Sequence, residues 1–226
     1  MQFTFYGHAC FAVQIAGKKL LFDPFITGNP LAKEIDINAI EADYILVSHG
    51  HGDHVADLIQ IAKNTDALVM GAYEIMDWAG KQGMSNVHPM NFGGKVRFDW
   101  GTVRFVPATH SSVLPDGTYG GNPGGFVVSS VDGSFYYSGD TALMMDMQLI
   151  PRYANIDVAI LPVGDNFTMG VEDALVAAEF VQCSKVFGVH FDTFGYIKIN
   201  HEEAIDYFKK AGKTLILPEI GKTISI

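Results

Sequence analysis

The chain has 226 residues, 48% of them hydrophobic and 18% charged, and its formal net charge is -10 at pH 7. This composition fits one compact domain with a sizeable core, and the negative charge argues against a nucleic acid as partner, because binding to its backbone depends on Lys and Arg. The sequence has no apolar run long enough to span a membrane, no secretory leader pattern and only two cysteines, Cys10 and Cys183, so we expect a cytoplasmic protein with neither a membrane partner nor a disulfide framework.

The first part of the chain reads as a meander of strands followed by alternating strands and helices. Short β-branched or aromatic runs bounded by Gly, Asp or Pro predict strands, whereas apolar residues at helical spacing predict helices. Residues 25–38 lack periodicity and are expected to form a long functional loop. Helices are expected from Val55 onwards and at 73–81. Strands are expected at residues 2–6, 11–15, 19–22, 44–47, 67–70, 87–90, 95–98 and 102–107.

The second part repeats this alternation. The Asp132-Gly133 pair predicts a type I′ turn within a hairpin, and Asn200 with Glu203 forms a capping-box pattern before the last helix. Strands are expected at 125–131, 134–138, 158–161, 185–189, 215–217 and 223–226, and helices at 143–152, 171–183 and 201–211. This order predicts an α/β (α+β) fold in which two packed sheets carry helices outside. We expect one domain over residues 1–226, with related halves at about 1–110 and 111–226.

The loop between the strand at 44–47 and the helix after it is rich in metal ligands. It reads Ser48-His49-Gly50-His51-Gly52-Asp53-His54, and imidazole with carboxylate suits zinc, manganese or iron. Residues two apart in an extended segment face the same side, so His49 and His51 can close on one ion while Asp53 and His54 face elsewhere. Four ligands on so short a loop fit two ions about 3.5–4 Å apart better than one. The alternative is a polar loop that caps the helix.

Three further residues of the same chemical type follow predicted strands. His110, Asp140 and His190 each lie at or just beyond a strand end, as the ligand loop itself does. Strand ends of stacked sheets gather along one edge, where ligands far apart in the sequence can meet. Each histidine alone would more often be an ordinary structural residue. Together with the loop they predict one shared metal centre.

The pattern His49-x-His51-x-Asp53-His54 resembles the signature of the metallo-β-lactamase superfamily, and four more motifs of that superfamily match in order around Asp23, His110, Asp140 and His190. The resemblance implies a four-layer αββα sandwich of two mixed β-sheets. It also implies that one ion takes His49, His51 and His110, the other takes Asp53, His54 and His190, Asp140 bridges both, and Asp23 orients the ligand loop from behind.

The implied activity is metal-dependent hydrolysis, in which a hydroxide held between two ions attacks an ester, lactone or phosphoester of a small molecule. Zinc is expected first, with Mn²⁺ or Fe²⁺ as alternatives. Within the superfamily the chain resembles bacterial and archaeal metal-dependent hydrolases related to the ascorbate-6-phosphate lactonase group, through Tyr6-Gly7-His8-Ala9-Cys10-Phe11, Asp23-Pro24-Phe25 and Thr193-Phe194. Gly195-Tyr196 departs from that group, which often has prolines there, so the pocket wall is expected to differ.

Three other functions stay open. The same scaffold carries iron-dependent oxidoreductases, although His51 favours hydrolysis because diiron redox members often have glutamate there. A nuclease of the tRNA-processing type is disfavoured by the acidic charge and the lack of a basic arm. A non-catalytic binding module is disfavoured because every ligand position is filled.

Residues around the centre are less specific. Asp53 is expected to steer a proton, and His8, in a turn between two strands, to act either near the site or as a structural hydrogen-bonding residue. Cys10 fits a small core residue, and His88 and His201 fit structural roles. Lys198 and Tyr119 are expected near the mouth of the site, and Asp165 and Thr168 at its rim.

Substrate specificity is expected to lie in three loops, at residues 26–37, 111–122 and 192–200. Phe25, Ile26 and Leu31 are apolar residues of the first long loop. If exposed, they would form either a homo-oligomer surface or a lid.

Overall fold

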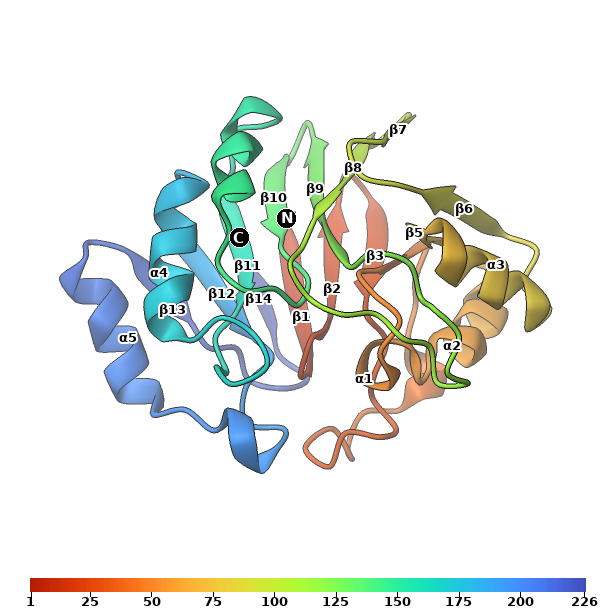
Figure 1. Ribbon diagram of the computed structural model, residues 1–226, viewed down its shortest axis with the longest axis horizontal. Helices are drawn as coiled ribbons and strands as arrows, with labels where there is room; N and C mark the ends of the chain where they lie inside the picture. Colours follow the sequence, from red (N-terminus) through yellow and green to blue (C-terminus); the bar gives the residue numbers. More distant parts are fainter.

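The computed structural model describes all residues, 1–226, as two seven-stranded mixed sheets packed face to face. Helices cover the outer face of each sheet (Figure 1), so the four-layer expectation is confirmed. The first sheet has the order β14 (Thr223–Ser225), β1 (Gln2–Gly7), β2 (Cys10–Ile15), β3 (Lys18–Phe22), β4 (Tyr44–Val47), β5 (Leu68–Ala72), β6 (Val87–Met90). The second has the order β13 (Thr214–Ile216), β12 (Lys185–Val189), β11 (Val158–Pro162), β10 (Gly133–Tyr137), β9 (Gly124–Ser130), β8 (Gly101–Pro107), β7 (Lys95–Phe98).

The helices divide between the two sheets. Three pack beside the first sheet: α1 (Gly52–Val55), α2 (Leu58–Thr65) and α3 (Tyr73–Lys81). Two cover the second: α4 (Val171–Phe180) and α5 (His201–Lys210). Short 3-10 helices occur at η1 (Ile37–Ala39), η2 (Met145–Arg152) and η3 (Gly195–Ile197). None of the helices combines the length and the apolar character needed to cross a lipid bilayer.

Aromatic side chains fill the space between the sheets. Phe22 of the first sheet lies edge-on to Phe126 and Phe135 of the second, and Phe3 contacts Phe187 with ring centroids 4.5 Å apart. All five are completely buried, and each such side chain contributes about 1.5–3 kcal/mol through the hydrophobic effect. This core fixes the position of one sheet against the other, and so the position of the strand ends that meet at one edge of the molecule.

The topology brings the carboxyl ends of several strands to one edge. Strands β10 to β13 run parallel, and β8 runs in the same direction as β10 because both are antiparallel to β9. Strands β3 to β6 are parallel to one another in the first sheet. Segments that follow β4, β8, β10 and β12 therefore meet at the same side, which includes α1 at the lower edge of Figure 1.

The sheets do not divide the chain near residue 110. The chain crosses to the second sheet between β6 and β7, and β14 returns to pair with β1 in the first. The hairpin turn also differs from expectation: Gly133 already pairs with Ser130, and neither Val131 nor Asp132 has positive φ, so the turn is not type I′.

Two predicted helices were wrong in detail. The helix expected from Val55 is interrupted between α1 and α2, where the backbone N–H of Asp57 donates to the carbonyl of Pro24 instead of to the preceding turn, and the Asp57 carboxylate accepts from Ile26 N–H and Thr27 N–H. The helix expected at 143–152 is the 3-10 helix η2, which contains Pro151. Phe25 and Ile26 are buried, so of the three apolar loop residues only Leu31 is exposed.

Candidate metal centre

All seven predicted ligands converge at this edge, and they come from both sheets. His49, His51, Asp53 and His54 lie on the segment from β4 into α1. His110 follows β8, Asp140 follows β10 and His190 follows β12. His190 has φ 57°, a left-handed conformation that turns the chain sharply at the strand end, and its N–H donates to the carbonyl of His8 at 2.7 Å.

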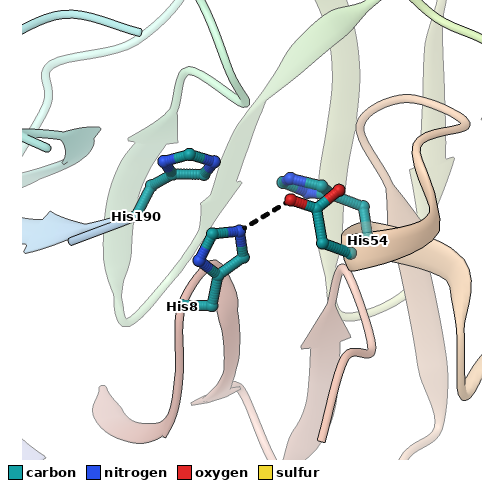
Figure 2. Close-up of side chains that lie close together, drawn as sticks. His8, His54 and His190 are labelled. Atoms are coloured by element: carbon teal, nitrogen blue, oxygen red, sulfur yellow. Dashed lines mark hydrogen bonds and ion pairs between the residues drawn. The ribbon is translucent and has the colours of Figure 1, made fainter. Parts of the chain in front are cut away.

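The ligand atoms form two neighbouring groups, and within each group all ligand atoms lie within 4.8 Å of one another; Asp23 makes a third such group with His49 and His54, one residue from each of the two. One contains His49, His51 and His110. The other contains His8, Asp53, His54 and His190. Its three histidines point toward a common space in Figure 2. The division between the two groups follows the expected one, with His8 as an addition.

Asp140 lies between the two groups. Its Oδ2 is 3.0 Å from His190 Nε2, 3.2 Å from His54 Nε2, 3.7 Å from His110 Nε2 and 4.0 Å from His49 Nε2. Burial would raise the pKa of Asp140, but the adjacent His190 and His54 hold it well below its usual range. The carboxylate is therefore ionised and reaches imidazoles of both groups.

Asp23 supports the ligands from inside the protein. Its Oδ1 accepts from Ser48 N–H at 2.7 Å, and its Oδ2 accepts from Ser48 Oγ at 2.5 Å, Tyr137 Oη at 2.6 Å and His54 Nδ1 at 2.9 Å. Ser48 Oγ in turn lies 3.0 Å from His49 Nδ1. The Asp23 carboxylate is fully buried, and it orients His54 directly and His49 through Ser48. Such hydrogen bonds to the second ring nitrogen fix the direction of histidine rings in metal sites.

The hydrogen bonds leave a donor set that fits a metal ion. His54 donates Nδ1–H to Asp23, so in a neutral ring its Nε2 carries a bare lone pair. That nitrogen has no hydrogen-bond partner although it is buried, and it faces the acceptor oxygen of Asp140. Two facing acceptors need a cation between them. In the metal-free protein a proton fills this role, since Asp140 and Asp23 outweigh the effect of burial and hold the pKa of His54 well above its usual value.

His8 contacts the second group through Asp53. Its Nε2 lies 3.1 Å from Asp53 Oδ2, the contact dashed in Figure 2, and its Nδ1 lies 3.0 Å from Thr193 Oγ1. Burial lowers the pKa of His8 to about 4, so the ring is neutral at pH 7. Cys10, two residues later, is buried, and burial raises the pKa of its thiol, so it is no nucleophile at neutral pH.

Five of the seven candidate ligand side chains form the floor of a cavity of about 740 Å³. His51, Asp53, His110, Asp140 and His190 face it from below. The rest of the lining comes from Ser111 and from two loops, which contribute Phe167, Thr193, Phe194, Gly195 and Tyr196. The cavity is large enough for a small-molecule substrate.

Several predicted rim residues lie elsewhere. Lys198 lines a separate neighbouring cavity, because the backbone folds back at Asp192, whose N–H donates to Ile197 O. Tyr119 donates to Asn122 outside the cavity, and residues 26–37 do not line it. Asp165 lines the neighbouring cavity, and Thr168 lines neither cavity. Phe167, which was not predicted from the sequence, lines the cavity above the candidate ligands.

The other two histidines are outside the centre. His201 Nε2 bonds to Asp192 Oδ2 at 2.7 Å and so braces the base of the loop that follows His190. His88 lies on β6, at the edge of the first sheet, and belongs to neither ligand group.

Comparison with known proteins agrees with this fold and this cluster. A family model described as "Beta-lactamase superfamily domain" matches residues 2–190. A protein of Flavobacterium johnsoniae named "UPF0173 metal-dependent hydrolase" is 56% identical over 226 residues, 100% of both chains. The chain therefore belongs to the beta-lactamase superfamily and, within it, to the UPF0173 metal-dependent hydrolases. The resemblance seen in the sequence is confirmed.

Solved structures extend the comparison. Igni18, described as a novel metallo hydrolase from Ignicoccus hospitalis, has a TM-score of 0.89 and 31% identity, with 99% of this chain and 97% of that chain covered. An isothiocyanate hydrolase from Delia radicum gut bacteria has a TM-score of 0.80 and 21% identity, with 100% and 99% covered. The latter likeness is one of fold.

Proposed function

We propose that this protein hydrolyses an ester, lactone or phosphoester bond of a small molecule with the help of two divalent metal ions. The observation that carries the proposal is the convergence of ligand atoms from both sheets on the floor of one cavity. The net charge of -10 supports a small-molecule substrate rather than a nucleic acid.

The donor set supports a specific assignment of ligands. His49, His51 and His110 would hold one ion, Asp53, His54 and His190 the other, and Asp140 would be shared. Imidazole and carboxylate donors suit zinc first, with manganese or iron as alternatives. Bound here, two such ions would lower the pKa of a water between them and supply hydroxide near neutral pH.

Asp53 and His8 provide the proton-handling part of the proposal. Burial would raise the pKa of Asp53, but the hydrogen bond from His8 and the nearby His54 hold it well below the usual range. Because a carboxylate only accepts, His8 Nε2 must carry the proton that points to Asp53, and Nδ1 then accepts from Thr193. Asp53 is thus held ionised at the cavity floor as a hydrogen-bond acceptor, where it would orient the attacking water rather than act as a strong base.

Replacement of His8 by alanine is expected to lower kcat by roughly 10–100-fold while both ions stay bound, because Asp53 loses the group that orients it. Elemental analysis and steady-state kinetics on the same samples measure both quantities. The matched control is His88→Ala, which removes a histidine outside the centre. A fall in metal content to one ion would instead show that His8 is needed for metal binding, either as a ligand or by holding Asp53, and unchanged kcat would exclude the positioning role.

The proposed function is tested by elemental analysis of protein purified without added metal, combined with a screen of ester, lactone and phosphodiester substrates. Close to two zinc or manganese ions per chain, with turnover lost on chelation, is the expected result. Iron-loaded protein that consumes oxygen and hydrolyses nothing would favour the oxidoreductase. Protein that binds no metal after reconstitution would refute the ligand assignment.

A further inference from the structure

Three aromatic side chains form the walls of the cavity above the metal-binding floor. Phe194 lies edge-on to His8, with ring centroids 5.2 Å apart. Phe167 and Tyr196 approach each other at 78° with centroids 6.2 Å apart, although they belong to different loops. Both remain exposed, by 49% and 78%. A single exposed aromatic residue needs no explanation, but three around one cavity are typical of a ligand site.

The loop that carries Phe167 is held in place by its own backbone. Asp165 and Asn166 both have left-handed φ, and the N–H of Asp165 pairs with the carbonyl of Met169 at 3.1 Å. Met169 N–H donates to Thr141 O, next to Asp140. Phe167 thus sits at the tip of a tight turn fastened to the metal-binding segment.

The second loop is fastened in the same way. Asp192 has left-handed φ, its N–H donates to Ile197 O at 2.8 Å, and its side chain accepts from Ile199 N–H and bonds to His201. The short helix η3 at the tip carries Tyr196. Because both aromatic walls are positioned before a ligand arrives, little ordering entropy would oppose binding of an apolar group between them.

No cationic side chain lines this cavity. Its eleven lining residues include histidines and the two carboxylates Asp53 and Asp140, but neither Lys nor Arg. Lys198 belongs to the neighbouring cavity, where Asp165, Glu172 and Glu203 share the lining with it. A charged group on the part of a substrate between the aromatic walls would gain no charged partner there, whereas an apolar group would cover the exposed faces of Phe167 and Tyr196.

We infer that the substrate is an uncharged ester or lactone that carries an aromatic or similarly bulky apolar group next to the bond cleaved. The inference rests on the proposed function and narrows it: the floor receives the carbonyl end, and Phe167, Phe194 and Tyr196 receive the apolar group. Small molecules that would place a phosphate or carboxylate between the walls are disfavoured, because the walls offer that group no counter-charge.

Hydroxamate probes separate the contribution of the walls from that of the floor. Benzohydroxamic and acetohydroxamic acid share one metal-binding head and differ only in phenyl against methyl, and 4-carboxybenzohydroxamic acid adds a negative charge to the ring. Dissociation constants are measured by calorimetry on the metal-loaded protein. We expect the phenyl probe to bind at least about tenfold more tightly than the methyl probe, and the carboxylated probe to lose most of that gain.

Two variants and a control assign the effect to residues. Phe167→Ala and Tyr196→Ala should each reduce the phenyl-to-methyl ratio several-fold, whereas Tyr73→Ala, an exposed aromatic residue at the start of α3, should leave it unchanged. Equal affinities of metal-loaded protein for both probes, or tighter binding of the carboxylated probe, would overturn the substrate class alone. Protein that retains no metal and binds no hydroxamate would overturn the proposed function and this inference with it.

Discussion

Replacement of Asp140 by alanine is expected to lower kcat/KM by roughly a thousandfold or more and to reduce the metal content below two ions per chain. Asp140 Oδ2 lies within 4.0 Å of Nε2 atoms from both ligand groups, so its loss removes the one carboxylate that both groups share. Metal-ion stabilisation of the transition state is worth several kcal/mol, and each 1.36 kcal/mol is about tenfold in rate. Kinetics and elemental analysis on the same preparation measure the two effects.

The control for this variant is Asp146→Ala, which removes an exposed aspartate on η2. It should keep the activity and metal content of the unaltered protein. An Asp140→Ala protein with two ions and undiminished turnover would show that the shared position is not needed, and the proposed ligand assignment would then be wrong.

Replacement of Asp23 by alanine is expected to lower the free energy of unfolding of the metal-free protein by about 3 kcal/mol or more. The change leaves Ser48 N–H, Ser48 Oγ, Tyr137 Oη and His54 Nδ1 without their buried acceptor, and each unsatisfied buried donor costs about 1–3 kcal/mol. Urea unfolding in the presence of EDTA measures this stability. Metal affinity should also fall roughly 10–100-fold, since His49 and His54 lose their orienting partner.

Tyr137→Phe provides a graded comparison that keeps the Asp23 carboxylate. It removes one of the four hydrogen bonds, so a loss of about 1 kcal/mol is expected, with little change in metal affinity. If Asp23→Ala fails to fold, the phenylalanine variant still tests the network. Equal effects of the two substitutions on metal affinity would contradict the orienting role of Asp23.

The clustering of the candidate ligands could be predicted from their residue types and from their positions at strand ends. Histidine and aspartate at successive strand ends have few common purposes besides metal binding, and the parallel strands bring those ends to one edge. His8 could be placed near the site by the same argument. That it contacts Asp53 depends on its left-handed φ of 57°, which no sequence pattern specifies.

The cavity walls could not be predicted in the same way. Phe167 is a lone aromatic in a polar loop, and only the left-handed turn at Asp165 and Asn166 aims it at the cavity. Lys198 lies in a loop after His190, but the turn between Asp192 and Ile197 directs it to the neighbouring cavity, and a sequence pattern does not specify that turn. The break before α2 could not be predicted, because the carbonyl of Pro24, which accepts the N–H of Asp57, is distant in the sequence.

Each ligand group draws on both sheets. His49 and His51 follow a strand of the first sheet and His110 one of the second, and Asp53 and His54 are likewise combined with His190. Neither sheet alone can assemble a complete group, so the centre forms only when the two sheets are docked. If the proposed ions bind, they would act as crosslinks between the sheets, and by mass action the melting temperature should rise with the concentration of free metal.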